Sequence, residues 1–104
     1  MRKGTMEIFL NNETPKIVDG YVSKEFGFYK NEIKNYDVTH LKTGLKILSF
    51  MKMKHAKRFV ELLEETTFPI PFNEVTREGV LNNTIEIWKN ANTVMELSEK
   101  AKNI

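Results

Sequence analysis

The side chains that most often carry chemistry are few in this sequence, and their spacing builds no recognisable site. The two histidines, His40 and His55, belong to neither a His-x-x-x-His nor a His-Glu-x-x-His pattern, which would place two metal ligands on one helical face. The chain has no cysteine, which excludes thiolate nucleophiles, zinc fingers and iron–sulfur clusters. We therefore expect no metal site and no cofactor.

Acid–base and nucleophilic chemistry also lack the residue pairs that they require. Glu64 and Glu65 are adjacent, so on a helix their side chains point about 100° apart and do not converge on one bond. The serines stand outside a nucleophile-elbow pattern, and the glycines form no phosphate-binding loop. We expect no catalytic residues and a protein that is not an enzyme. An enzyme whose site is assembled only by the fold stays an open alternative.

The distribution of charge is the strongest functional pattern in the chain. The formal net charge is +2 over 104 residues, but residues 1–58 carry +6 and residues 59–104 carry −4. Between positions 42 and 58 the charged residues are all basic. They are Lys42, Lys46, Lys52, Lys54, Lys57 and Arg58. We predict that these residues form a basic partner-binding surface.

The order of charges within the expected helix over residues 52–65 opposes the helix dipole. Acidic residues near an N-terminus and basic residues near a C-terminus each stabilise a helix by about 0.3–1 kcal/mol, yet this segment begins with lysines and ends with glutamates. One explanation is a solvated face on which Arg58 and Lys57 pair with Glu61. The other is a cationic end that meets an anionic partner.

Short strand-like segments fill the first half of the chain. Met6 to Leu10 is an apolar run that ends at Asn11 and Asn12, and Asp19-Gly20 is a hairpin-type dipeptide. The further expected strands are Lys16 to Val18, Tyr21 to Tyr29, Lys34 to Leu41 and Leu45 to Phe50. These segments predict an antiparallel sheet of four or five strands within about residues 6–50.

Two details of the predicted sheet concern side chains that bear on a site. Phe26 and Phe28 share one face of their strand, while Tyr29 lies on the other. A two-residue turn at Thr43-Gly44 would pair residue 42 with residue 45. His40 would then lie opposite Ile47, and Thr39 opposite Leu48.

The second half of the chain has helical periodicity. Apolar residues at three- and four-residue steps predict an amphipathic helix over about 52–65, and Pro69 and Pro71 predict an extended linker over 67–72. A second helix is expected to begin at 77 or 83, capped by Thr76 or Asn82, and to end at about 102. Its apolar stripe places Trp88 in the core. The same stripe offers an alternative, a dimer interface formed by Ile87, Trp88, Ala91 and Met95.

These elements predict a single α+β domain over residues 1–104, with the two helices packed on one face of the sheet. No apolar run approaches the roughly 20 residues that cross a bilayer, and the first residues do not resemble an export signal. Together with the absence of cysteine, this predicts a cytoplasmic protein that does not contact a membrane.

The segment Tyr36-Asp37-Val38-Thr39-His40-Leu41-Lys42-Thr43-Gly44-Leu45, with Phe50, Ala56 and Phe59 after it, resembles small accessory proteins of phages and conjugative elements of low-GC Gram-positive bacteria. In those proteins an aromatic-x-Val-Thr-His stretch and a Thr-Gly turn precede a helix with a Lys-rich start. The resemblance covers positions 36–59 and carries no assigned functional residue. It implies a small protein that acts by binding, as an inhibitor of host defence, a regulator or a replication accessory.

The function expected from these observations is that of a non-catalytic binding protein of a mobile genetic element. It would inhibit a host defence nuclease by protein–protein contact, in the manner of an anti-CRISPR protein. The alternative is a nucleic-acid-binding accessory or regulatory protein that uses the basic 42–58 segment. Lysine outnumbers arginine 13 to 3, and base readout favours arginine, so we expect a protein partner in preference to a nucleic acid.

Overall fold

A five-stranded antiparallel meander followed by helices makes up the fold. The computed structural model describes residues 1–9 and 14–104. The strands pair in sequence order and are β1 (Arg2–Ile8), β2 (Lys16–Val22), β3 (Phe26–Lys30), β4 (Tyr36–His40) and β5 (Leu45–Phe50). They are followed by α1 (Met53–Glu65), the 3₁₀ helix η1 (Phe72–Glu74), α2 (Arg77–Leu81), the 3₁₀ helix η2 (Ile87–Asn90) and α3 (Ala91–Lys102). The predicted α+β class is confirmed.

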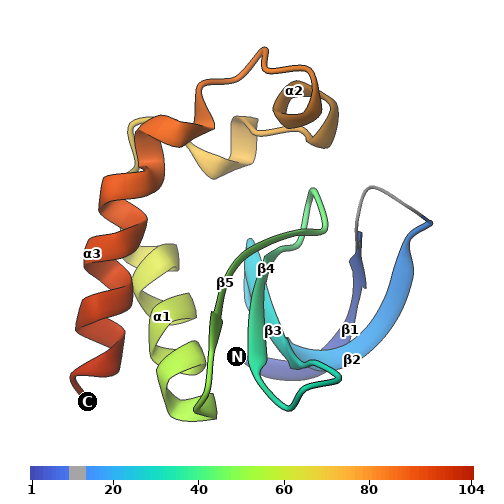
Figure 1. Ribbon diagram of the computed structural model, residues 1–104, viewed down its shortest axis with the longest axis vertical. Coiled ribbons are helices and arrows are strands. Elements are labelled where there is room, and N and C mark those ends of the chain that lie inside the picture. Colours follow the sequence, from blue (N-terminus) through green and yellow to red (C-terminus); the bar gives the residue numbers. More distant parts are fainter. Residues whose placement is uncertain (10–13) are drawn as a thin grey trace.

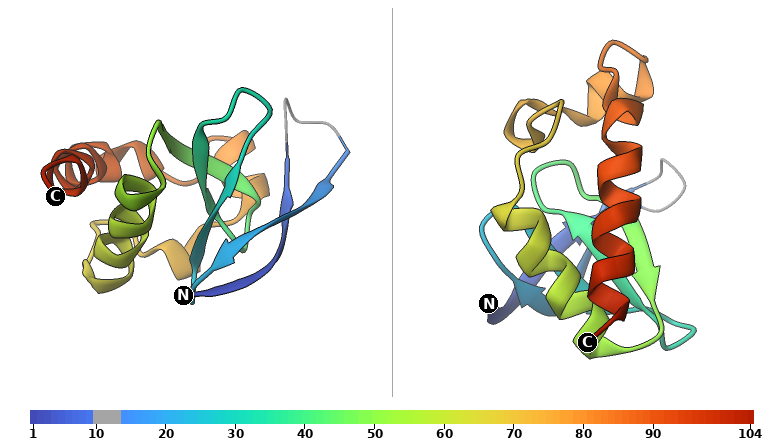
Figure 2. Two further views of the ribbon diagram at one scale, coloured as in Figure 1. Left: turned by 90° about the horizontal axis from the view of Figure 1, so that it is seen from below. Right: turned by 90° about the vertical axis from the view of Figure 1, so that its left-hand side faces the viewer.

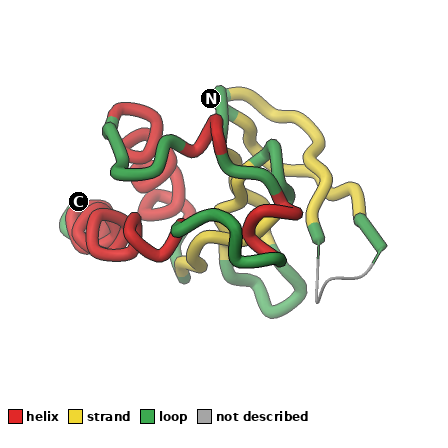
Figure 3. Tube along the Cα trace, turned by 90° about the horizontal axis from the view of Figure 1, so that it is seen from above, coloured by secondary structure: helices red, strands yellow, loops and turns green. Residues whose placement is uncertain are grey.

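The sheet curls, so that β1 and β2 swing away from β3, β4 and β5 (Figure 1). The backbone N–H of Phe9, just after β1, donates to the carbonyl of Gly44 in the β4–β5 turn at 3.0 Å, which brings the two ends of the meander together. α1 lies beside β5, and α3 lies against α1 and runs in the opposite direction (Figure 2). Seen from above, the strands gather on one side of the molecule and most of the helical chain on the other (Figure 3).

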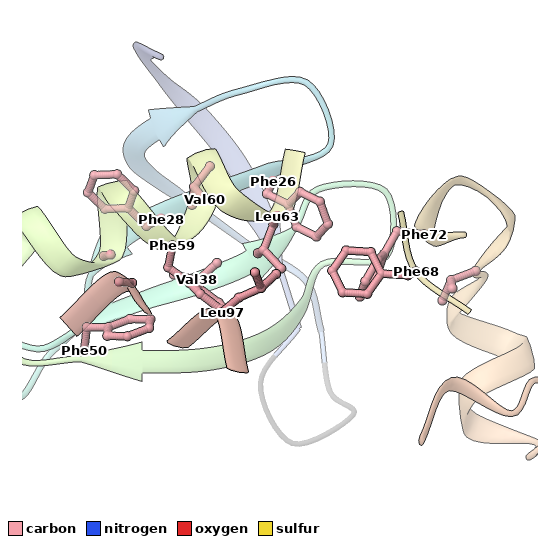
Figure 4. Packing of buried hydrophobic residues seen from close by; sticks show 13 residues of the cluster. Phe26, Phe28, Val38, Phe50, Phe59, Val60, Leu63, Phe68, Phe72 and Leu97 are labelled. Atoms are coloured by element: carbon pink, nitrogen blue, oxygen red, sulfur yellow. The ribbon is translucent and has the colours of Figure 1, made fainter. Parts of the chain in front are cut away.

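The larger core lies between the sheet and the helices (Figure 4). Aromatic rings fill most of it: Phe50 and Phe59 have centroids 5.0 Å apart, and Phe68 meets Phe72 edge-on at 4.8 Å. Phe26, Phe28 and Val38 come from the sheet, α1 contributes Ala56, Phe59, Val60 and Leu63, and α3 contributes Leu97 and Ala101. This packing stabilises α1 because burying large apolar side chains is the main favourable term in folding.

A second, smaller cluster lies inside the curl of the sheet, on the face opposite α1. It consists of Met6, Ile8, Val22 and Tyr29. Tyr29 therefore faces away from Phe26 and Phe28, as the strand alternation predicts. The curl lets a small chain bury apolar residues on both faces of one sheet.

A buried carboxylate links three strands on this second face. Asp37 of β4 accepts hydrogen bonds from the Tyr29 hydroxyl (3.1 Å), the Asn31 amide (2.9 Å) and the Ser49 hydroxyl. Burial and the neighbouring Asp37 charge raise the pKa of Tyr29 to about 12. The carboxylate thus has three donors, which offsets the cost of its burial.

The expected hairpin turn at Asp19-Gly20 is wrong. Both residues lie within β2, where Asp19 pairs with Thr5 and Gly20 with Gly4. Glycine is required at position 20 for close approach of the backbone, because a Cβ there would lie 2.3 Å from the Phe28 carbonyl oxygen.

The expected strand boundaries of the first half also differ from the structure. β1 begins at Arg2 rather than Met6, and the expected end of that strand, residues 10–12, lies outside the described residues. The expected strand from Tyr21 to Tyr29 is two strands, separated by a turn in which Ser23 N–H donates to the Phe26 carbonyl at 2.8 Å.

The β4–β5 register also differs from the prediction. His40 pairs with Leu45 and Thr39 with Lys46, and a bulge then shifts the register so that Val38 pairs with Leu48. The turn has four residues, 41–44, rather than two, and Gly44 adopts a φ of +73°. The Thr43 hydroxyl holds this turn, because it lies 3.0 Å from His40 Nδ1 and accepts from the Leu45 N–H at 3.3 Å.

The first predicted helix is confirmed, but the expected continuous helix over 77/83–102 is wrong. Thr76 caps α2 by accepting from the Gly79 N–H at 3.0 Å, as one of the two predicted starts requires, and α2 ends at Leu81. Asn83 has a left-handed φ of 55°, which no helix interior accommodates. The break rotates the following stripe, so that Trp88 is 68% exposed and does not lie in the core.

Glu64, near the end of α1, has a structural role that explains part of the reversed charge order. Its Oε2 accepts the backbone N–H groups of Glu25 at 2.8 Å and Phe26 at 3.3 Å, in the turn that leads into β3. Hydrogen bonds to a charged acceptor are stronger than neutral ones. The acid is therefore kept at an unfavourable end of the helix because it fastens α1 to the sheet.

Replacing Glu64 by alanine should reduce the free energy of unfolding by about 1–3 kcal/mol, because two backbone donors lose their acceptor. The control is Glu65→Ala, which removes an equal charge from the same helix end at an exposed position and should change stability by less than about 0.5 kcal/mol. Urea denaturation followed by circular dichroism measures both. Equal losses in the two variants would contradict the role of Glu64.

Candidate functional site

The structure does not bring the six predicted basic residues together. Lys42 lies in the β4–β5 turn, where its Nζ donates to the Asn73 carbonyl at 2.7 Å, and Lys46 lies near the start of β5. The other four lie where α1 begins, at the opposite end of β5 (Figure 1). A strand of six residues spans about 20 Å, so the basic run divides into two separate groups.

The group at the start of α1 gains a lysine from elsewhere in the chain. α3 runs antiparallel to α1, so its last residue, Lys102, lies close to that end (Figure 2). We call Lys52, Lys54, Lys57 and Lys102 the cationic end. Partial burial and the charges of Lys54, Lys52 and Lys102 lower the pKa of His55. From the sequence, the only sign that Lys102 belongs to the cationic end is its position in the last turn of the predicted helix.

Some basic residues near the start of α1 have an acidic partner, and others do not. Arg58 pairs with Glu61 at 3.7 Å, as the sequence predicts, and Lys102 lies 4.0 Å from Glu99. Within residues 1–9 and 14–104, Lys52, Lys54 and Lys57 have no acidic partner within 4.0 Å. These three lysines are exposed and take part in no ion pair in the described part of the chain.

An apolar hollow lies between β5 and the C-terminal segment, and sequence reasoning did not identify it. It has a volume of about 350 Å³, and β5 contributes Leu45, Lys46, Ile47 and Leu48 to its lining. The facing wall consists of Val75, Val80, Ile87, Ala91, Val94 and Met95. We call this hollow the β5 cleft. Its volume is in the range of natural ligand pockets.

Three of the four residues of the predicted helix interface line the β5 cleft. Ile87, Ala91 and Met95 belong to its wall, whereas Trp88 is not among the lining residues. Trp88 is 68% exposed and Met95 53% exposed, so both present large apolar surface to solvent. The structure thus places the predicted stripe around a cleft rather than on one continuous helix face.

Two interactions hold the wall of the cleft in place. The buried side chain of Asn90 accepts from the Ile70 N–H at 2.9 Å and donates to the Ile70 carbonyl at 2.8 Å, which joins the proline linker to η2 and α3. The Arg77 guanidinium lies 3.5 Å from the centroid of the Phe9 ring, a cation–π contact that joins α2 to the end of β1.

His40 lines the cleft from β4 and is only 2% exposed. Its ring packs against Phe26 and Phe72, with centroids 5.6 Å and 5.2 Å away. Burial, and secondarily the charge of Lys42, lower its pKa to about 4, so the ring is neutral at pH 7. Its Nε2 makes no hydrogen bond to any described residue. Apart from Lys46, the described lining is therefore uncharged at neutral pH.

A cluster of polar side chains lies around Asp37. Ser49 donates to Asp37 on the face of the sheet opposite α1, but its neighbours there include no histidine base. Among residues 1–9 and 14–104, no three His, Asp or Glu side chains gather in a way that could hold a metal ion. In the same ranges, every helix is too short or too polar to cross a membrane.

Comparison with known proteins adds no relative to this description. No protein-family model matches the chain, and neither the curated proteins nor the solved structures contain a match.

The stability of the protein should fall in acid because His40 is buried in its neutral form. The pKa is about 4 in the folded state and 6.5 in the unfolded state, so between these values the unfolded chain binds more protons. The contribution of the neutral His40 to the free energy of unfolding is therefore fully present above about pH 6.5. The free energy of unfolding falls by up to about 3 kcal/mol as the pH drops to 4.

This loss should be absent from a His40→Leu variant, whose unfolding free energy is compared with that of the wild type across the same pH range. The control is His55→Gln, which removes the other, only partly buried histidine and should leave most of the pH dependence in place. A pH profile that His40→Leu leaves unchanged would contradict the burial of a neutral His40.

Proposed function

We propose that the protein acts by binding another protein through the surface around the β5 cleft, without catalysing a reaction. The observation that carries the proposal is the exposure of Trp88 and Met95 next to an apolar hollow. Tryptophan is enriched among the residues that dominate binding energy at interfaces, and methionine adapts to varied apolar partners. Neither side chain at this exposure contributes much to the core, so the fold itself does not account for them.

Within this proposal, the narrower role is that of an inhibitor encoded by a mobile genetic element. It would act in the host cytoplasm on a defence nuclease, by protein–protein contact in the manner of an anti-CRISPR protein. The support is the resemblance of residues 36–45 to accessory proteins of phages and conjugative elements. That segment forms β4, the β4–β5 turn and the first residue of β5, and its residues His40, Thr43 and Leu45 line the cleft. The resembling segment therefore contributes three residues to the lining of the cleft.

The test is affinity capture from lysate of a low-GC Gram-positive host, using the full chain and a Trp88→Ala/Met95→Ala double variant. The wild type should retain a stoichiometric protein, and the double variant should lose at least about tenfold in affinity, the effect of about 1.4 kcal/mol. The matched control is Ile17→Ala/Ile33→Ala, which removes two exposed apolar side chains from β2 and the β3–β4 turn. Recovery of no partner, or of the same partner by all three proteins, would contradict the proposal.

A second function, nucleic-acid binding, is favoured by one separate observation, the lysines of the cationic end, three of which have no acidic partner within 4.0 Å in residues 1–9 and 14–104. Lys52, Lys54 and Lys57 lie at the start of α1, and Lys102 lies at the end of the antiparallel α3. After partial burial, the charges of Lys54, Lys52 and Lys102 lower the pKa of His55. Such a group suits phosphate contacts, which carry no sequence information. Lys42 and Lys46 lie at the other end of β5 and do not belong to this surface.

Nucleic-acid binding is tested with a fluorescent single-stranded oligonucleotide titrated at several salt concentrations. If the cationic end is used, Lys52→Gln/Lys54→Gln should weaken binding and reduce the slope of log K against log salt by about 1.4, which is about 0.7 for each lost phosphate contact. Lys42→Gln/Lys46→Gln removes the same charge from the other end of β5 and should leave the slope unchanged. No binding at about 50 mM salt would exclude this second function.

A further inference from the structure

β5 is an edge strand with one side of its backbone unused. In the described part of the chain, β4 is the only strand paired with β5, and no turn or loop backbone group bonds to residues 46–49. The outward N–H and C=O groups of such a strand form a row of donors and acceptors. An extended polypeptide satisfies the regular part of such a row, because its own groups alternate with the same period.

The β5 cleft runs along this unused edge. Leu45, Lys46, Ile47 and Leu48 are consecutive, and all four line the cleft. Leu45 pairs with His40 and Lys46 with Thr39, so these two side chains point to opposite faces of the sheet. A hollow that contacts both residues borders the edge of the strand rather than one face. The facing wall comes from α2, η2 and the first half of α3. This wall would cover the side of a bound segment that faces away from β5.

The bulge in β5 selects against another copy of this chain as the occupant. The register shift after Lys46 leaves Ile47 without a partner on β4 and interrupts the regular edge. Bulges are one of the devices by which sheets avoid long edge-to-edge pairing. The interrupted edge suits a short segment, and β5 itself has only six residues.

The charge of the cleft indicates the chemistry of that segment. Lys46 is the only residue of the described lining that is charged at neutral pH, since the pKa of His40 is about 4. The remaining wall is aliphatic, apart from the aromatic ring of Phe72 and the polar side chains of Thr43, Asn90 and His40. A complementary segment therefore carries apolar side chains toward α3 and one acidic side chain toward Lys46.

We infer that the β5 cleft accepts an extended, apolar segment of the partner protein as a sixth strand, with an acidic side chain of that segment beside Lys46. This inference rests on the proposed function and names the form in which the partner binds. Main-chain hydrogen bonds to the β5 edge supply affinity, and the apolar wall supplies selectivity for side chains. Trp88 and Met95 then lie at the rim, where they contact the flanks of the segment.

The experiment selects linear peptides from a random heptapeptide display library on the full chain and resynthesises the strongest binder. Single N-methyl groups are then placed at each position in turn. Strand addition predicts losses of about tenfold at every second residue and small losses between them, because alternate N–H groups face β5. Lys46→Glu should weaken binding of an acidic peptide, whereas Lys30→Glu, at the far end of β3, should not.

Amide exchange of residues 46–49, measured by NMR, gives the second readout. Bound peptide should slow the exchange of these amides relative to the free protein. Failure to enrich any peptide, equal tolerance of N-methylation at all positions, or unchanged exchange would each overturn strand addition. Protection of the same amides by dimerisation, seen by sedimentation without peptide, would identify a second copy as the occupant and also overturn it.

These outcomes separate the inference from the proposed function. A captured protein whose binding needs Trp88 and Met95, but which leaves the β5 amides unprotected, would contradict strand addition alone. If the wild-type protein captures no partner from the lysate, the proposed function is contradicted, whatever the peptide experiments show.

Discussion

The C-terminal third of the molecule depends on one buried amide. Asn90 uses both its oxygen and its nitrogen on the backbone of Ile70, so the proline linker and the start of α3 are fixed to each other. A segment with two breaks in its helices has little cooperative stability of its own. The clamp supplies the missing constraint, and the wall opposite β5 stays in place because of it.

The reversed charge order of α1 reflects two local demands rather than one. At the C-terminal end, Glu64 is needed as an acceptor for the turn that leads into β3. At the N-terminal end, Lys52 and Lys54 face solvent with Lys102 nearby, and the helix has no side-chain cap there. The hydrogen bonds of Glu64 explain why an acidic residue stands near the C-terminal end of α1. Lys52 and Lys54 have no acidic partner among the described residues, so either an anionic contact or solvation explains them.

Sequence periodicity predicted the elements that bury a regular face and failed where a side chain or a close approach decides the geometry. α1 was predictable because Ala56, Phe59, Val60 and Leu63 recur at helical spacing against a broad sheet. The Thr43 turn was not, because the buried contact of its hydroxyl with His40 lengthens the loop. Asp19-Gly20 has the composition of a turn, but glycine is needed there because β2 and β3 approach closely.

The β5 cleft and the place of Lys102 in the cationic end depend on long-range packing, which the local spacing of residues does not encode.

The exposure of Trp88 has a consequence for spectroscopy. It is the only tryptophan of the chain, and it is surrounded largely by water in the folded state. Unfolding therefore alters its surroundings little, and its fluorescence reports poorly on global stability. Its emission is instead sensitive to whatever covers the rim of the β5 cleft. The protein thus carries an intrinsic optical reporter of occupancy, while its folding is better followed through the backbone.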